Sequence, residues 1–279
     1  MDWWYVCAYP GRAELMDEAT RVLIPWLKVQ ARQESAAKWF FIRYWDTSGH
    51  HLRMRVQCTA DGADRLYSRT EEIAGLLRTL KPGTPSERLV PGAAFSGVPR
   101  SSLVRTRLYA PELARYGGER GVHLAEKLFT ASTSWYAEQD LAGLDHRLGR
   151  AALAIEYMQS IVSEALPLDD QKAFWAEHRR HWGWQLRMVI PEREDLRALL
   201  RRRVSEIESS TENQLDYQPG LRKHVDTIRN VLDIGQAAAL PVTRSQLLLY
   251  YMHMDLNRWG FLPAEECLLG LISSSQIPT

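Results

Sequence analysis

The sequence predicts an α+β fold: an N-terminal half with a mostly antiparallel sheet and flanking helices, followed by a helical C-terminal half. Short aromatic and β-branched segments with alternating apolar and polar residues occur before residue 118. From residue 121 onward, apolar residues recur at helical spacing almost without interruption. We therefore expect a single domain over residues 1–279, with an α+β half over 1–118 and a helical half over 119–279.

The first part of the chain predicts a strand, a helix and a hairpin. Residues 3–9 are aromatic and β-branched and end at Pro10-Gly11, which indicates a strand that runs into a turn. Apolar residues then recur at helical spacing up to about residue 32. Segments 39–45 and 51–58 flank a break at residues 46–49. The second segment alternates strictly, so we expect a β-hairpin with one apolar and one basic face.

The remaining elements follow from the same patterns. A helix is expected over 63–80, and the Pro- and Gly-rich residues 81–100 are expected to form a long loop of the kind that often binds ligands or acts as a lid. Residues 102–109 alternate again, and residues 111–118 close a short turn or helix. Further helices are expected over 122–138, 143–165, 169–189, 191–212, 220–234 and 243–256.

Composition limits the classes of function. Lys and Arg number 35 against 34 Asp and Glu, and the resulting net charge of +1 disfavours nucleic acid or an anionic membrane as a partner. Cys7, Cys58 and Cys267 are widely spaced, which argues against a disulfide framework or a cysteine-built zinc site and favours a reducing cytoplasm. No segment approaches the roughly 20 apolar residues of a membrane span, and none has the pattern of a signal peptide. Ten Trp and eleven Tyr form the core or line a groove for an extended peptide.

Common catalytic motifs are absent, and three weaker patterns favour plain structural roles. The dinucleotide, P-loop, nucleophile-elbow and zinc-protease signatures do not occur. Ser35 and Lys38 match an S-x-x-K pattern without its companion motifs, so a surface turn is favoured. His178 and His181 could hold a metal, but a solvated helix face is the stronger interpretation. The basic run Arg197–Arg203 is most simply a solvated face as well.

The hairpin gathers cations. Arg43 lies on its first strand, and alternation places His51, Arg53 and Arg55 on one face of the second. Crowded cations repel one another unless an anion lies among them, and arginine binds carboxylates through two hydrogen bonds. The residues alone leave two interpretations open: a carboxylate-binding site, or ion pairs inside the protein.

Two further clusters carry possible chemistry. Glu112 precedes Arg115 by three residues, so in a helix its carboxylate can orient the guanidinium, and the following Tyr116-Gly-Gly allows a close backbone approach. An ordinary surface ion pair is the alternative there. His253 lies in a strongly apolar helical segment, with Asn257 and Arg258 about one turn later. A core histidine with a satisfied hydrogen bond is the alternative for this cluster.

Together these segments resemble a known family. Phe41-Ile-Arg-Tyr-x-Asp-x-x-Gly-x-His-Leu-Arg-x-Arg55, Tyr109-x-Pro-Glu-x-x-Arg-Tyr-Gly-Gly118 and His253-Met-x-x-Asn-Arg258 are similar to the three signature segments of the lantibiotic dehydratase C-terminal domain. This glutamate-elimination domain also occurs as free-standing proteins in thiopeptide gene clusters. The resemblance runs in order from residue 3 to about residue 270.

The resemblance implies a lyase that acts on a leader-bearing precursor peptide. A separate glutamyl-tRNA-dependent protein would esterify Ser or Thr with glutamate, and this domain would eliminate the glutamate to leave dehydroalanine or dehydrobutyrine, without a cofactor or metal. The implied catalytic residues are Arg53, Arg55, Arg115, Glu112 and His253, with His253 as general acid/base and the arginines on glutamate and on developing negative charge. The expected substrate contacts are Arg43, His51, Tyr116, Tyr250, Tyr251, Asn257 and Arg258.

Departures from the family pattern keep a second reaction open. Ala131 stands where an acidic residue is common, Tyr250-Tyr251 replaces an apolar pair, and Trp259 replaces an aliphatic residue. Thiopeptide pyridine synthases have the same fold and join two dehydroalanines by a formal [4+2] cycloaddition with loss of water and leader peptide. Added phenols and an indole suit that reaction, whereas the retained arginines favour elimination. A non-catalytic peptide-binding subunit also stays open.

Overall fold

The computed structural model describes residues 1–81, 87–93, 102–209 and 218–275. The chain divides into two compact units: Met1–Pro85 with Phe95–Gly143, and Ser86–Ala94 with Leu144–Thr279. The first unit extends past the expected boundary at residue 118, because the helix that follows packs on the sheet. The predicted α+β class, with a small antiparallel sheet followed by helices, is confirmed.

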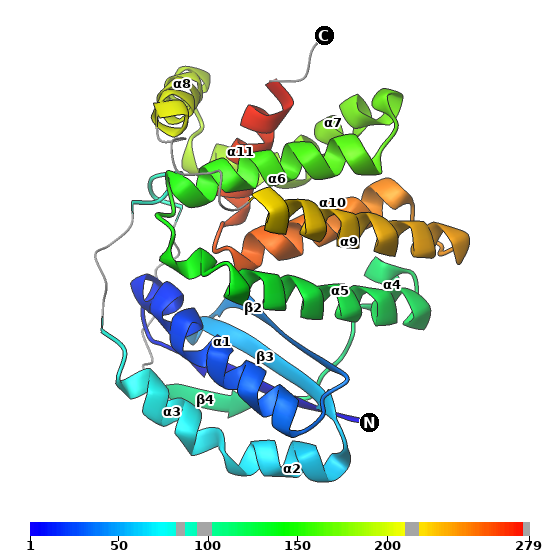
Figure 1. Ribbon diagram of the computed structural model, residues 1–279. Coiled ribbons are helices and arrows are strands. Elements are labelled where there is room, and N and C mark those ends of the chain that lie inside the picture. The colour runs from blue at the N-terminus through cyan, green and yellow to red at the C-terminus, as the bar shows by residue number, and fades with distance from the viewer. Residues whose placement is uncertain (82–86, 94–101, 210–217, 276–279) are drawn as a thin grey trace. The chain divides into compact units, whose positions relative to one another are not determined.

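The first unit is built on a four-stranded antiparallel sheet in the order β2-β3-β1-β4 (Figure 1). The predicted first strand and hairpin are both present, and the alternating segment after residue 102 supplies the fourth strand. β1 pairs with both β3 and β4, so it lies in the middle of the sheet. The strands are β1 (Asp2–Tyr9), β2 (Lys38–Asp46), β3 (Gly49–Cys58) and β4 (Leu103–Thr106).

Helices cover one face of this sheet and one of its edges (Figure 1). The indole of Trp4 on β1 packs 6.1 Å from that of Trp26 on α1 and 6.4 Å from the ring of Tyr67 on α2, measured between ring centroids. α3 also contacts β1 and β4. The helices of this unit are α1 (Met16–Gln33), α2 (Ala60–Ser68), α3 (Thr70–Arg78), α4 (Leu113–Tyr116) and α5 (Glu119–Glu138), with short 3₁₀ turns at Ala13–Leu15 and Leu141–Gly143.

α5 closes the edge of the sheet at β2. Thr130 Oγ1 accepts a hydrogen bond of 3.2 Å from the backbone N–H of Trp39, and Thr133 Oγ1 accepts one of 3.4 Å from that of Phe41. Lys38, the first residue of β2, forms a buried ion pair of 2.5 Å with Glu126 on α5. Lys38 is therefore not a partner for Ser35, which lies in an exposed turn as expected.

The single helix expected over 63–80 is two helices, α2 and α3, that meet at Arg69. Around this break, the hydroxyls of Ser68 and Thr70 donate hydrogen bonds of 2.7 Å to the carbonyls three residues earlier. Such side-chain bonds compete with the regular helical pattern, which accounts for the interruption.

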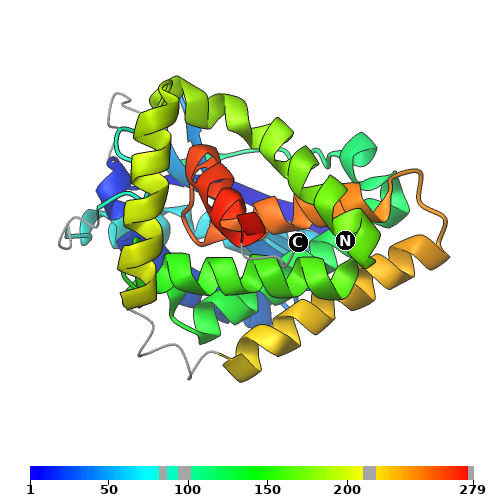
Figure 2. The same ribbon diagram turned by 90° about the horizontal axis from the view of Figure 1, so that it is seen from above.

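The second unit consists of helices arranged around α11, which Figure 2 shows in red between α6, α7 and α8. α11 is buried on nearly all sides, from Ala264 to Ser273. No amphipathic stripe marks a helix of this kind, so helical periodicity does not predict it. The helices are α6 (Gly149–Ala165), α7 (Leu168–Val189), α8 (Arg193–Ser209), α9 (Gln218–Ala237), α10 (Arg244–Arg258) and α11 (Pro263–Ser275).

His178 and Arg203 were both expected on solvated helix faces, and for these two residues the expectation is wrong. His178 is 1% exposed, because α7 packs it against α11. Arg203 is fully buried, and its Nε donates to the carbonyl of Leu89 while Nη1 pairs with Glu206 at 2.7 Å. A charged side chain can be buried when its hydrogen bonds are satisfied, which a charge run does not reveal.

The long loop expected over 81–100 is described only at residues 87–93; the rest of it lies outside the described residues. Leu89 and Val90 are fully buried. The backbone N–H of Leu89 donates a 2.9 Å hydrogen bond to Oε1 of Glu265, which also pairs with Arg88. The described part of this segment is thus fixed in the second unit. Among the described helices, none combines the length and the apolarity that a membrane crossing requires.

Candidate active site

The predicted site residues fall into both units, and each group is described separately. In the first unit, one face of the sheet carries arginines from two strands. Cys7 on β1 pairs with Arg53 on one side and with Arg105 on the other, and Tyr5 pairs with Arg55. The next alternate residue after β4, Arg107, follows the same side, and hydrogen bonding to the side chains of Cys7 and Tyr9 raises its pKa. We call Arg53, Arg55, Arg105 and Arg107 the arginine face.

Arg55 is the most buried member of the arginine face. It is 8% exposed, and its Cζ lies 4.4 Å from the ring centroid of Tyr5, 5.0 Å from that of Tyr109 and 5.4 Å from that of Phe40. Burial lowers the pKa of Arg55, while the phenols of Tyr5 and Tyr109 raise it. Within the described part of the chain, its buried Nε has no hydrogen-bond partner. Aromatic ring faces stabilise this cation in place of an acid.

Neither Arg53 nor Arg55 has a carboxylate within ion-pair distance in the described part of the chain. A buried charge without a counter-ion is costly, and a bound carboxylate would remove that cost. The alternative of internal salt bridges therefore does not describe these two residues. The arrangement is suited to binding an anion.

His51 orients Arg53. The Nε of Arg53 donates a 3.4 Å hydrogen bond to Nε2 of His51, so Nδ1 carries the proton and donates to the carbonyl of Gly49 at 3.1 Å. Burial lowers the pKa of His51 to about 4, which keeps the ring neutral near pH 7. The guanidinium of Arg53 is also stacked on Tyr44, 3.3 Å from its ring centroid. His51 is fully buried, and its hydrogen bond holds Arg53 in place; the expected contact of His51 with a substrate stays a prediction.

Arg43 does not belong to the arginine face. It pairs with Leu52 across the hairpin, so its side chain points to the opposite, helix-covered face. There, Nη2 lies 2.7 Å from Oδ1 of Asp17 on α1 and donates a 2.8 Å hydrogen bond to Tyr136 on α5. The expected substrate contact of Arg43 is replaced by an ion pair between the sheet and its helices.

The second predicted cluster lies at α4. Arg115 and Glu112 form the expected ion pair, 2.7 Å between Nη1 and Oε2, and their side chains are 39% and 58% exposed. Tyr116 is buried and packs against Phe129 on α5, 5.7 Å between ring centroids; its expected contact with a substrate stays a prediction. Gly117 and Gly118 have φ angles of 80° and 90°, which explains their identity without a close neighbour. A Cβ at Gly118 would meet nothing within 4 Å.

In the second unit, His253 is held by a carboxylate. Its Nδ1 lies 2.7 Å from Oε2 of Glu266 on α11, and its ring stacks on Trp182 of α7 with 4.3 Å between centroids. The side chain of His253 is 20% exposed and that of Glu266 is 1% exposed. The histidine therefore has a buried side toward Glu266 and an accessible side, which distinguishes it from a core histidine.

The predicted residues of the third cluster lie on two different faces of α10. Tyr250, His253 and Asn257 are each partly exposed and recur at spacings of three and four, which places them on one helix face. Tyr251 is 1% exposed and Arg258 is fully buried, and the expected substrate contacts of these two residues stay predictions. Helical geometry turns them toward the core instead.

The buried side of α10 holds a charged network. Asp255 accepts hydrogen bonds of 2.8 Å from Tyr157 on α6 and 2.8 Å from His224 on α9, and Arg258 donates one of 3.2 Å. Trp259 is also buried, with its ring centroid 5.1 Å from that of Tyr157. The indole at position 259 thus packs in this core.

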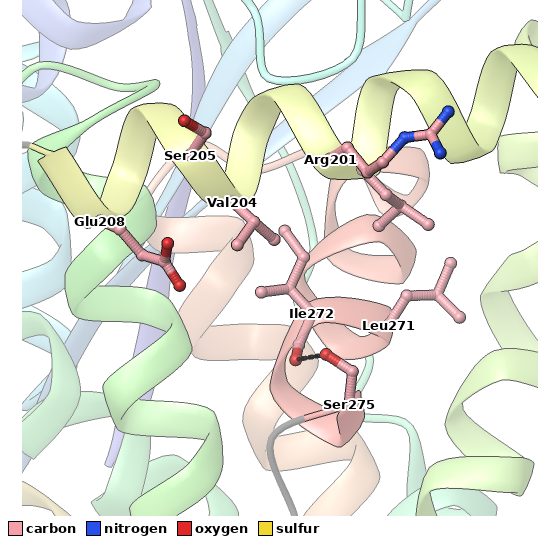
Figure 3. Close-up of a pocket in the computed structure, with 8 residues that line it drawn as sticks. Arg201, Val204, Ser205, Glu208, Leu271, Ile272 and Ser275 are labelled. Carbon is pink, nitrogen blue, oxygen red and sulfur yellow. Dashed lines mark hydrogen bonds between the residues drawn. The ribbon is translucent and has the colours of Figure 1, made fainter.

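A separate cavity lies between α8 and α11 and contains none of the candidate residues (Figure 3). Its volume is about 420 Å³, and Val204 and Ile272 point toward one another across it. The residues around it are Leu200, Arg201, Val204, Ser205, Glu208, Leu271, Ile272 and Ser275. Among the described residues, no group of three or more His, Cys, Asp or Glu side chains is placed to hold a metal ion.

Sequence reasoning missed two sets of residues. Arg105 and Arg107 alternate along β4 and its extension, a signal that was present but was not connected with the hairpin. Glu266 lies in α11, the helix that was not predicted. It is remote from His253 in the sequence, so helical spacing does not connect the two residues. The stacking of Trp182 on His253 joins α7 to α10 and has no local signal.

Comparisons with known proteins agree with this fold. The tRNA-dependent lantibiotic dehydratase MibB from Microbispora sp. 107891 aligns with a TM-score of 0.64 at 18% identity, over 99% of this chain and 28% of that chain. The pyridine synthase TbtD from thiomuracin biosynthesis aligns with a TM-score of 0.61 at 18% identity, over 99% of this chain and 97% of that chain. At these identities the likeness concerns the fold. A search of curated proteins gives no match.

A family model provides the assignment that structural likeness alone does not. The model described as the lantibiotic biosynthesis dehydratase C-terminus matches residues 3–274, which is nearly the whole chain. The resemblance expected from the three sequence segments is thereby confirmed. The protein belongs to the family of lantibiotic biosynthesis dehydratase C-terminal domains.

Proposed function

We propose that the protein eliminates glutamate from glutamylated Ser or Thr residues of a leader-bearing precursor peptide. The observation that carries this proposal is Arg55, a buried guanidinium among aromatic rings that has no carboxylate within ion-pair distance among the described residues. A leaving glutamate is an anion, and it supplies the missing counter-charge. Glutamate enters the substrate in a preceding step, for which we propose a separate glutamyl-tRNA-dependent partner.

The reaction requires one proton transfer and one leaving group. Removal of the proton on Cα gives an enolate-like carbanion, the Cα–Cβ double bond forms, and the Cβ–O bond breaks to release the glutamate carboxylate. In this proposal, Nε2 of His253 takes up the proton, since Nδ1 is engaged by Glu266. Arg53 and Arg55 bind the departing carboxylate and stabilise its charge. The ion pair of Arg115 and Glu112 offers a further cation for the same charge.

Pyridine formation is the second candidate, and Tyr250 favours it. This tyrosine lies on the same partly exposed face of α10 as His253 and could supply an additional proton donor. Tyr251 and Trp259 do not add to this argument, because both are buried.

Mass spectrometry on two defined substrates separates these reactions. A precursor glutamylated at Ser should lose glutamate and gain dehydroalanine in the presence of the protein. A precursor that already contains two dehydroalanines should remain unchanged. Release of the leader from that second substrate, together with a new ring absorbance, would instead identify a pyridine synthase.

His253→Ala and Tyr250→Phe serve as matched variants on the same helix face. Under the elimination proposal, His253→Ala abolishes glutamate loss without unfolding the protein, whereas Tyr250→Phe retains it. Normal glutamate loss in His253→Ala would contradict the assigned role of the histidine.

A further inference from the structure

The carboxylate of Glu266 stands behind the candidate acid/base His253. It accepts a hydrogen bond from Nδ1 at 2.7 Å, and in the described part of the chain Nε2 has no protein partner. The two ring nitrogens are therefore unequal. One faces the buried carboxylate, and the other is left for chemistry.

Glu266 is ionised although it is buried. Burial opposes its ionisation, but the neighbouring His253 and His178 outweigh this effect and lower the pKa of Glu266 to about 2. An ionised carboxylate accepts hydrogen bonds and donates none, so it requires the proton of a neutral His253 to be on Nδ1.

The surrounding helices fix this pair. Trp182 on α7 stacks on the imidazole of His253 at an interplanar angle of 25°. His178 on α7 places Nε2 at 3.6 Å from the second oxygen of Glu266. Tyr157 on α6 and Cys267, the next residue on α11, also interact electrostatically with Glu266. On the opposite side of α10, His224 and Arg258 balance the charge of Asp255, so Asp255 does not take the place of Glu266.

We propose that Glu266 is a positioning residue for His253: it fixes the Nδ1–H tautomer and the ring orientation, so that Nε2 exchanges protons with the substrate. This inference rests on the proposed acid/base role of His253. The same relationship between a carboxylate and a histidine operates in hydrolytic triads, where the carboxylate stabilises the imidazolium without taking its proton. Glu266 is thus not itself a catalytic residue, because it contacts no substrate.

The test is Glu266→Gln, which preserves the side-chain volume and removes the charge. An amide can donate to Nδ1 as well as accept from it, so ¹⁵N NMR of the substrate-free variant should show a mixture of His253 tautomers in place of the single Nδ1–H form. In glutamate release, kcat should fall at least about 10-fold with KM little changed.

Glu265→Gln is the matched control. Glu265 is the neighbouring residue on α11 and is equally buried, but it pairs with Arg88 and His146. Loss of this carboxylate should lower the stability without altering the His253 tautomer. If Glu266→Gln does not fold, Glu266→Asp retains the charge and should keep His253 in the Nδ1–H form.

Two outcomes are distinguishable. An unchanged ¹⁵N signature of His253 in Glu266→Gln would overturn the positioning role. If the signature changes but the wild-type protein releases no glutamate from the glutamylated precursor, the positioning role of Glu266 stands and the proposed reaction fails.

Discussion

Gly270 on α11 lies against the imidazole of His178 on α7 so closely that a Cβ at position 270 would be 2.5 Å from Nδ1. This contact accounts for a glycine in the middle of a helix, where it otherwise costs stability. It also places His178 beside Glu266. A residue that seems poorly suited to a helix is thus required by the packing of the second unit.

Gly270→Ala should therefore lower the free energy of unfolding by about 1–3 kcal/mol, the usual range for overpacking a core. Gly75→Ala on α3 is the control, because a Cβ there meets Arg78 at an ordinary 3.8 Å. Urea denaturation of both variants measures the difference. Equal free energies of unfolding of the two variants would show that α7 and α11 can move apart without a loss of stability.

Arg55→Lys should be nearly as harmful as Arg55→Ala. A lysine cannot form two parallel hydrogen bonds to a carboxylate or stack a planar cation on Tyr5 and Tyr109. A hydrogen bond to a charged group contributes about 1.5–3 kcal/mol, so kcat/KM for glutamate release should fall roughly 10- to 100-fold. Full activity of the lysine variant would mean that a simple positive charge suffices.

Arg43→Met should show the opposite behaviour. Because Arg43 bonds Asp17 and Tyr136 beneath the sheet, its loss should destabilise the protein by about 1–3 kcal/mol and leave KM for the precursor unchanged. Thermal unfolding and steady-state kinetics on one preparation test both parts. A raised KM at unchanged stability would contradict the placement of this side chain.

Two buried histidines should make the protein lose stability on mild acidification. Burial lowers the pKa of His51 to about 4 and that of His146 to about 4, against about 6.5 in an unfolded chain. Because the folded values are the lower ones, the neutral rings contribute stability above pH 6.5, and this stability is lost as the pH falls from 6.5 toward 4. Urea midpoints measured from pH 8 to pH 4 should fall through this window, and His146→Gln should fall less steeply. A constant midpoint down to pH 5 would refute the expectation.

Much of the fold and part of the candidate site could be predicted from the sequence because they depend on local periodicity. Alternation located the strands and placed Arg53 and Arg55 on one face, and it also indicates that Arg43, two residues after Phe41, faces the helices. Helical spacing likewise separates Tyr250 from its neighbour Tyr251. The directions of these side chains therefore follow from the spacing of the residues in the sequence.

The missing parts depend on contacts between distant segments. α11 is buried on nearly every side, so no amphipathic stripe reveals it, and Glu266 was missed with it. The burial of His178 depends on Gly270, which is far along the chain. Tyr109 is one of the aromatic rings that surround Arg55 on β3. It approaches β3 because β4 pairs with β1, which is a contact between distant segments of the chain.

The contacts of Thr130 and Thr133 with β2 have a consequence for association between molecules. An edge strand with free amide groups is a template on which another chain can add, and many proteins block such edges with charges or prolines. Here two threonine hydroxyls of α5 already occupy the amides of Trp39 and Phe41. This side of the sheet is closed to strand addition by its own helix, which protects the hairpin that carries Arg53 and Arg55 from edge-to-edge aggregation.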